Sequence, residues 1–353
     1  MTVLKLGSLF DGIGVFPLAA VHCGMEPVWA SEIEARPISI TKRHFPDMLH
    51  LGDITKINGA EVPPVDVITF GSPCQDLSQI GTRNGFAGKK SSLFYQAMRI
   101  IEEMRYATNG RYPAFCIWEN VAGAFSSNDR LDFAAMLRAF TGAEVSVPPR
   151  GWAHAGMVRG GCADTAWRLL DAQYWGEPAL AQRRKRVFVV ADFAGQRAGE
   201  VLFKPRTVLP FSTISGPGGL SATQRGGVPA AQTGRQVPIV RPFSLRRMRT
   251  MAQVGDQKGF CASFGRGGEP FPTLLASVTA PFSFWYEGEE RDGFLRVLTP
   301  LECERLMGLP ENWTKYGCKN EEISDHARYR ALGNSIALPC AEYVMAGIAE
   351  VMN

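Results

Sequence analysis

An alternation of short apolar runs with amphipathic stretches constrains the fold most, and it fills the first half of the chain. Five runs each lead into a turn or a polar tail: LKLGSLF, PVWASE, DVITFGSP, AFCIWENV and RVFVVAD. Between them, apolar residues at helical spacing predict helices near 15–23, 35–44, 92–105 and 131–140. Strands that alternate with helices predict an α/β fold with a doubly wound, mostly parallel sheet. Such sheets bind ligands at the carboxyl ends of their strands.

The pattern changes near Gly195. Beyond it Gly, Pro, Ser, Thr and Arg dominate, as in STISGPGGLSATQRGGVPAAQTGRQVP, and helical periodicity is lost. Helical character returns in LTPLECERLMGL and in NSIALPCAEYVMAGIAEVM, whose apolar face needs a packing partner. We therefore expect a large domain over 1–195, a smaller loop-rich and β-containing domain over 196–290, and late elements over 291–353 that return to the large domain.

Composition indicates a soluble globular protein, with 45% hydrophobic and 20% charged residues. No apolar run reaches the roughly 18 to 20 residues of a membrane span, and the N-terminal stretch breaks at Gly7 and Asp11 before a signal-peptide core forms. We expect a cytoplasmic protein without membrane contact. The eight cysteines lack a C-x-x-C or Cys/His cluster, so the sequence indicates neither a metal site nor a disulfide framework.

Basic residues gather in one segment, although the net charge is only +4. Between Phe203 and Lys258 a single acid, Asp256, stands against nine basic residues: Lys204, Arg206, Arg225, Arg235, Arg241, Arg246, Arg247, Arg249 and Lys258. Such a segment is typical of surfaces that meet phosphates. A solvated arginine-rich surface is the alternative interpretation.

Three strand ends carry residues suited to an adenosine-bearing ligand. The first strand runs into LFDGIG, where Gly-x-Gly allows backbone N–H groups to approach a ligand. A dinucleotide fingerprint requires a third glycine at position 17, which is Pro, and this counts against NAD. Glu32 follows the second strand, where an acid can bind ribose hydroxyls, and Asp53 follows the next short run. Taken singly, either acid is more often a helix cap or a solvated group.

Two further strand ends carry reactive groups. Cys74 in GSPCQDLS follows a predicted strand, and a turn, helix N-terminus or nearby cation would favour its nucleophilic thiolate. Glu119 ends the strand in CIWENV, where an apolar setting would keep its proton near neutral pH, and Asn120 could hold the neighbouring loop through its backbone. A buried structural cysteine and a helix-capping acid are the plain alternatives.

The stretch QRRKRVFVV places Gln182, Arg184 and Arg186 at period two before a buried strand. On an extended segment these three side chains share one face. Arginines there can bind phosphate or a substrate carbonyl, and a solvated edge strand is the alternative.

Together these motifs resemble the DNA cytosine-C5 methyltransferases, including bacterial and phage modification methylases, in order and along nearly the whole chain. FDGIG resembles that family's cofactor loop, GSPCQ its nucleophile motif, ENV its acid motif and QRRKR its Gln-x-Arg-x-Arg motif. RVLTPLECERLMGLP and ALGNSIALP resemble its two late motifs. Ser72, where Phe is common, and Val15, where Gly is common, depart from the pattern.

The resemblance implies an S-adenosylmethionine-dependent methyltransferase fold and methyl transfer to C5 of a flipped cytosine in double-stranded DNA. It implies that the Cys74 thiolate adds to C6, that protonated Glu119 acts at N3, and that Arg184 and Arg186 hold the base. It assigns 1–195 to catalysis and cofactor binding and 196–290 to target recognition. The implied cofactor-binding residues are Phe10, Gly12, Ile13, Gly14, Glu32, Asp53, Ile54, Pro73, Leu93, Asn334 and Ser335. The implied DNA-binding residues are Gln75, Ser78, Arg83, Lys89, Lys90, Gln182, Arg246, Arg247, Arg249 and Thr273.

The resemblance also implies a monomer, with a cognate restriction endonuclease that acts separately as a partner. Three other functions compete with it. A relative of the same fold that methylates tRNA is disfavoured by Gln75 and the long basic segment. An NAD-dependent oxidoreductase would leave PCQ, ENV and QRRKR unexplained, and a non-catalytic DNA-binding module would not need both Cys74 and Glu119.

Overall fold

The computed structural model describes residues 3–72, 93–204, 239–243, 270–271, 273–274, 282–286 and 294–353. Its main element is an eight-stranded sheet in the order β3-β2-β1-β4-β5-β8-β7-β6. The strands are β1 (Lys5–Leu9), β2 (Glu26–Ser31), β3 (Leu49–His50), β4 (Val67–Phe70), β5 (Phe115–Val121), β6 (Ala155–Arg159), β7 (Asp164–Asp171) and β8 (Lys185–Asp192).

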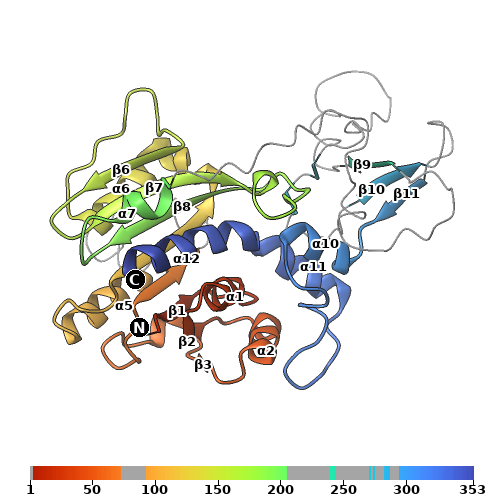
Figure 1. Cartoon of the computed structure of the whole chain (residues 1–353), viewed down its shortest axis with the longest axis horizontal. Coiled ribbons are helices and arrows are strands. Elements are labelled where there is room, and N and C mark those ends of the chain that lie inside the picture. The colour runs from red at the N-terminus through yellow and green to blue at the C-terminus, as the bar shows by residue number, and fades with distance from the viewer. Residues whose placement is uncertain are drawn as a thin grey trace.

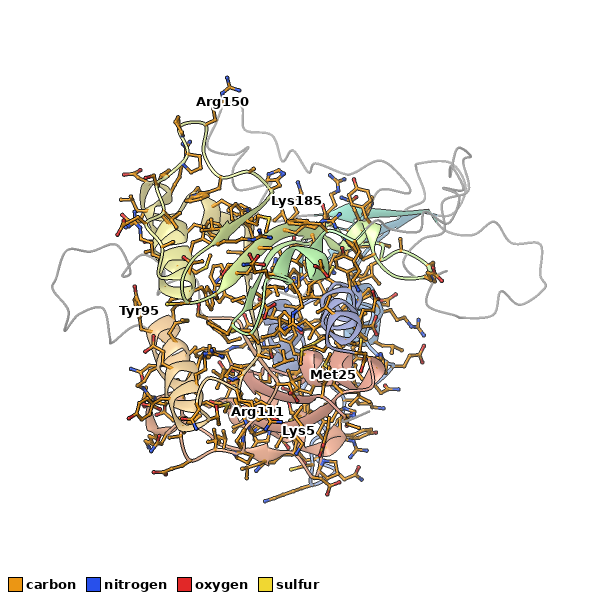
Figure 2. The ribbon with its side chains drawn as sticks, turned by 60° about the vertical axis from the view of Figure 1, so that its left-hand side comes forward. Lys5, Met25, Tyr95, Arg111, Arg150 and Lys185 are labelled. Carbon is orange, nitrogen blue, oxygen red and sulfur yellow. The ribbon has the colours of Figure 1, made fainter. Side chains whose placement is uncertain are left out.

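The sheet has two halves that differ in strand direction. From β3 to β5 all neighbouring strands pair in parallel. From β5 through β8 and β7 to β6 they pair antiparallel. In Figure 2, Lys5 and Met25 mark the parallel half in the lower part of the view, and Lys185 and Arg150 mark the antiparallel half above it. The predicted doubly wound α/β fold is confirmed, and the sheet is mixed.

Helices cover both faces of the sheet. They are α1 (Val15–His22), α2 (Ala35–His44), α5 (Leu93–Ala107), α6 (Leu131–Thr141), α7 (Ala198–Leu202), α10 (Pro300–Met307), α11 (Asp325–Asn334) and α12 (Leu338–Met352). Short 3-10 turns lie at Ile54–Lys56, Ala122–Phe125, Ser127–Arg130 and Ala172–Tyr174. All four helices predicted in the first half of the chain are present. A second, three-stranded sheet contains β9 (Ile239–Phe243), β10 (Phe282–Tyr286) and β11 (Phe294–Val297).

Alternation along the central strands divides the core in two. Phe115 and Ile117 of β5 belong to the cluster that contains α1 and α12, whereas Cys116 and Trp118 belong to the cluster with α5 and α6. This follows because successive side chains of a strand point to opposite faces. All four are fully buried, which marks β5 as a central strand covered on both sides.

The C-terminal helix α12 packs on the large sheet, as its apolar face predicts. It lies against α1 and α7, and Figure 1 shows it between α1 and the antiparallel half of the sheet. Pro339 near its start leaves the helix intact, because a proline in the first turn has no intrahelical N–H bond to lose.

Among the described residues no single helix has the length and apolar content of a membrane span. The pair α11 and α12, bent by 43°, passes that test only when its two helices are counted together.

Candidate active site

The loop after β1 has a left-handed backbone and an open side. Phe10, Gly12 and Gly14 have φ values of 54°, 61° and 77°. A Cβ added to Gly12 would meet no atom within 4 Å, so the backbone there faces open space. Glycine adopts this conformation without steric cost, and its bare backbone lets a ligand approach closely. The loop is therefore shaped to accept a ligand at Gly12.

Glu32 joins this loop to the end of β2. The backbone N–H of Gly12 donates to Oε2 of Glu32 at 2.9 Å, and the N–H groups of Ile33 and Glu34 donate to Oε1 at 2.8 and 3.0 Å. The predicted pair of Gly12 and Glu32 is thus brought together by the fold. The bond from Gly12 ties the loop to the carboxylate, and the bonds from Ile33 and Glu34 fix the orientation of that carboxylate.

Asp11 lies buried inside the same loop. The hydroxyl of Thr41 on α2 donates to its Oδ2 at 3.1 Å, and its Oδ1 has no hydrogen-bond partner among the described residues. Burial raises the pKa of Asp11 to about 7. The sequence interpretation passed over this residue, although an acid between Phe10 and Gly12, directly after an apolar strand, was a usable signal.

A tryptophan from the late part of the chain is hydrogen-bonded to the backbone of this loop. The indole Nε1 of Trp313 donates to the carbonyl oxygen of Ile13 at 2.8 Å, and its ring stacks on His44 with centroids 3.6 Å apart. Glu304 holds this tryptophan's segment: it accepts from the N–H groups of Asn312 and Thr314 at 2.8 and 2.9 Å. Its charge is balanced by Arg328, 3.0 Å away.

The remaining predicted cofactor residues of the parallel half are spread along its edge. Asp53 follows β3 and accepts from the N–H and the hydroxyl of Thr55 at 3.0 and 2.9 Å. These bonds hold the pKa of Asp53 below its usual range. Ile54 is buried next to it, and Leu93 begins α5.

Glu119 and Arg186 meet where β5 ends and β8 begins. Because β8 runs antiparallel to β5, Val121 pairs with Arg186, and the start of β8 lies at the carboxyl end of β5. Nε of Arg186 lies 2.9 Å from Oε1 of Glu119. Glu119 is 9% exposed, and burial raises its pKa although Arg186 and Arg184 oppose the shift. The site therefore contains an acid that binds its proton more tightly than an ordinary glutamate.

The chain leading to Cys74 is fastened beside Glu119. The Nδ2 of Asn120 donates to the carbonyl of Ser72 at 3.0 Å, and the indole of Trp118 donates to the Ser72 hydroxyl at 3.0 Å. A Cβ on Gly71 would lie 3.1 Å from Oε2 of Glu119. The predicted bond from Asn120 to the backbone of the loop is confirmed. The Ser72 hydroxyl accepts a hydrogen bond from Trp118, which a phenylalanine at position 72 could not do.

The Gln-x-Arg-x-Arg residues share one face, as their spacing predicts. Gln182 and Arg184 are 0% and 1% exposed, whereas Arg183 and Lys185, which alternate with the residues of the motif, are exposed. The guanidinium of Arg184 donates to the carbonyls of Leu274 and Gly333 at 2.9 and 2.8 Å, and also to that of Ser335. These are main-chain partners, in contrast to the base-holding role expected from the sequence. Neither amide atom of Gln182 has a partner among the described residues.

Several predicted residues lie elsewhere. The hydroxyl of Thr273 donates to the carbonyl of Arg183 at 2.7 Å, and Asn334 ends α11 with its side chain exposed. Lys204, the first cation of the basic segment, pairs with Glu350 of α12. Other predicted positions lie outside the described residues: Pro73, Cys74, Gln75, Ser78, Arg83, Lys89, Lys90, Arg246, Arg247 and Arg249.

Three buried cysteines among the described residues are unsuited to nucleophilic attack. Cys340 of α12 lies close enough to Glu119 and Arg184 to interact with their charges, but it is 3% exposed and burial raises its pKa to about 12. Burial also raises the pKa of Cys116 and Cys303 well above the ordinary value. In the described ranges, no group of three or more His, Cys, Asp and Glu side chains could hold a metal ion.

The fold is that of a methyltransferase. The structure superimposes on the Dnmt2 methyltransferase of S. pombe with a TM-score of 0.61, covering 99% of each chain at 17% sequence identity. At that identity the likeness concerns the fold.

Sequence comparison identifies the family. Residues 4–205 and 246–350 match the C-5 cytosine-specific DNA methylases, so the chain belongs to this family and is a DNA cytosine-5 methyltransferase. It is 26% identical to the type II methyltransferase M1.ScrFI of Lactococcus lactis subsp. cremoris, over 99% of this chain and 78% of that protein. It is 24% identical to a DNA N-6-adenine-methyltransferase of Escherichia phage P1, over 98% of this chain but only 61% of that protein's length.

Proposed function

We propose that this protein transfers a methyl group from S-adenosylmethionine to C5 of a cytosine flipped out of a specific double-stranded DNA sequence. The observation that carries the proposal is the buried Glu119, with raised pKa, paired with Arg186 beside the backbone that leads to Cys74. An acid that keeps its proton, a guanidinium and a nearby thiol are the groups that cytosine activation requires.

The edge of the parallel half fits S-adenosylmethionine. Gly12 offers open backbone at a positive φ, and the carboxylate of Asp53 is held in its charged form, which can accept hydrogen bonds. Glu32 keeps the loop in place while its partly exposed carboxylate faces the same edge. Phe10, Ile13, Gly14, Ile54, Pro73, Leu93, Asn334 and Ser335 complete the proposed set. When bound, the cofactor supplies an electrophilic methyl group.

The chain's own groups activate the base. The Cys74 thiolate forms a bond to C6 while the proton of Glu119 is shared with N3, so the electron pair of the C5–C6 bond becomes available at C5. After C5 has gained the methyl group, a base removes the C5 proton and the bond from C6 to sulfur breaks, which returns the thiolate. Arg186 holds Glu119 in place at 2.9 Å and can also donate to the base.

Neither group could reach a cytosine that is stacked in a duplex, so the base must flip out at a cost of a few kcal/mol. DNA contacts have to offset this cost. We assign them to the loop cations Arg83, Lys89 and Lys90, to Gln75, Ser78, Gln182 and Thr273, and to the basic segment with Arg246, Arg247 and Arg249. The family match leaves out residues 206–245, within the stretch 196–290 that we assign to target recognition.

The test is to incubate the purified chain with S-adenosylmethionine and either duplex DNA or tRNA, and to measure modified nucleosides by mass spectrometry. We expect 5-methylcytosine in DNA, and bisulfite sequencing should place it at one recurring sequence. N6-methyladenine in DNA, or 5-methylcytosine only in tRNA, would contradict the proposal. Cys74→Ser should abolish turnover and keep DNA binding measurable, so full activity in that variant would refute the covalent mechanism.

A further inference from the structure

Residues 270–271 and 273–274 are hydrogen-bonded to the segment that precedes β8. The N–H of Phe271 donates to the carbonyl of Ala181, and the N–H of Arg183 donates to the carbonyl of Phe271, both at 2.7 Å. The Thr273 hydroxyl adds a third bond at 2.7 Å, to the carbonyl of Arg183. Phe271 and Leu274 are 3% and 5% exposed. This short stretch, called here the docked segment, is therefore part of the core rather than a surface loop.

Arg184 binds the docked segment and a second, distant part of the chain at the same time. Its Nη1 donates to the carbonyl of Leu274, while its Nη2 donates to the carbonyls of Gly333 and Ser335 at the turn between α11 and α12. Its own N–H donates to Oδ1 of Asp171 at 3.0 Å, which fixes the arginine to the end of β7. One side chain thus joins three segments that are separated by 90 and 149 positions in sequence.

Burying a charge is costly unless it is paired and hydrogen-bonded, so a fully buried arginine depends on keeping its hydrogen-bond partners in place. Arg184 lies near Glu119, but its Nη donors go to backbone carbonyls. The planar guanidinium presents five donors in a fixed fork, so it can serve acceptors in different directions at once. An ammonium group has no such fork, and a neutral amide has too few donors for three carbonyls.

We propose that Arg184 is a positioning residue that couples the docked segment to the turn at 333–335. This inference rests on the proposed function, because Asn334 and Ser335 in that turn belong to the proposed cofactor site, and the docked segment lies within the proposed target-recognition stretch. Binding of cofactor at the turn then stabilises the docked segment. The docked segment is thereby linked to the occupancy of the cofactor site.

The test uses amide hydrogen exchange of the full chain, followed by mass spectrometry of its peptides. In the wild type, saturating S-adenosylmethionine should slow exchange at least several-fold both at 331–338 and at 271–274. In Arg184→Lys the first effect should remain, weakened, and the second should vanish. Cofactor affinity measured by calorimetry should fall about tenfold. Lys185→Met, a change at the exposed neighbouring position, is the matched control and should behave as the wild type.

Three results would overturn the inference: no effect of cofactor at 271–274 in the wild type, an unchanged effect there in Arg184→Lys, or an equal loss of protection in all peptides of that variant. If Arg184 variants do not fold, Thr273→Val removes only the bond to Arg183 and should still reduce the cofactor effect at 271–274. An unreduced effect in Thr273→Val would then count against the coupling. Failure of the wild type to bind S-adenosylmethionine at all would instead refute the proposed function.

Discussion

Two acids at the same edge of the sheet, Asp53 and Glu119, have opposite environments. Asp53 follows β3, a two-residue strand at the edge of the parallel half, and donors from Thr55 hold its pKa below its usual range. Glu119 lies in the central strand β5, two residues before its end, and burial there raises its pKa. Asp53 is therefore a charged acceptor at neutral pH, whereas Glu119 retains its proton to higher pH than an ordinary glutamate does.

The difference shows that the position of each acid relative to the sheet, more than its residue type, determines whether its carboxyl is charged or protonated near neutral pH. Asp53 lies three residues beyond the edge strand β3, partly exposed and next to donors of Thr55, which favour the charged form. The central strand β5, covered by helices on both faces, keeps water away from Glu119, which favours the neutral form. The antiparallel strand β8 then adds the arginine that keeps the buried acid in position.

After Cys74→Ser, the largest effect should come from Glu119→Gln. The amide keeps the shape of the side chain but cannot supply a proton, and general acid catalysis contributes roughly 10²- to 10⁴-fold. We expect the single-turnover rate of methyl transfer to fall about 10³-fold. Asp53→Asn should instead weaken cofactor binding with a smaller effect on that rate. Equal losses of the single-turnover rate in the two variants would contradict the different roles assigned to these acids.

Arg186→Met should lower the rate about 10²-fold, a loss of about 2.7 kcal/mol in barrier stabilisation, at about 1.4 kcal/mol per factor of ten. It should also shift the pH dependence. Arg186 lowers the pKa of Glu119, so its removal raises that pKa further and keeps the acid protonated to higher pH. The alkaline limb of the pH–rate profile should therefore move to higher pH. A limb that moves to lower pH would assign the acid role to another group.

Asp11→Asn tests whether burial raises the pKa of an acid in the parallel half, as it does for Glu119 in β5. The carboxyl of Asp11 titrates near 3.8 when unfolded and at about 7 when folded. Between these values the folded state holds the extra proton, so stability falls as pH rises toward 7 and then levels off. Asparagine removes this dependence.

The measurement for Asp11 is urea unfolding at pH 5 and pH 8. We expect the loss of unfolding free energy between these pH values to be smaller in Asp11→Asn than in the wild type, by on the order of 2 kcal/mol. Asp47→Asn, at an exposed aspartate, is the control. Identical pH dependence in the wild type and Asp11→Asn would show that Asp11 is solvated in the folded protein.

Trp313→Phe should have the smallest effect. It keeps the stacking surface against His44 but removes the indole donor to the carbonyl of Ile13. Loss of one buried hydrogen bond costs about 1 kcal/mol. We expect that decrease in stability and a several-fold rise in the dissociation constant for S-adenosylmethionine, with the rate at saturating cofactor unchanged. A slower rate at saturating cofactor would show that Trp313 also affects the methyl-transfer step at Glu119, and not only cofactor binding.

Local pattern predicted much of the fold, because the helices over 35–44, 93–107 and 131–141 have clear apolar periodicity and the helix over 15–22 is an apolar run with buried residues at successive positions. It missed β6 and β7, whose polar and small residues hide the alternation. It also missed α11, which has many charged residues and no continuous apolar face. β6 and β7 pair with each other across the short turn at 160–163, and β7 also pairs with the more distant β8, a contact that a local pattern does not record.

The site divides in the same way. Period two correctly predicted one shared face for Gln182, Arg184 and Arg186, because strand geometry is local, but it left open that this face is buried. It could not predict that Arg184 meets Leu274 and Gly333, since these partners are brought close only by the tertiary fold. The support of Ile13 by Trp313, 300 positions away, is long-range for the same reason.

The docked segment also decides where this chain can be cut and rejoined with a relative. A junction placed after 274 would replace Phe271 and Leu274 with the residues of the relative. Both side chains are packed in the core beside the large sheet of this chain. A junction placed before 270 would keep the native contacts with Ala181, Arg183 and Arg184. Chimeras that exchange residues 205–269 should therefore fold more often than chimeras that exchange everything up to 290.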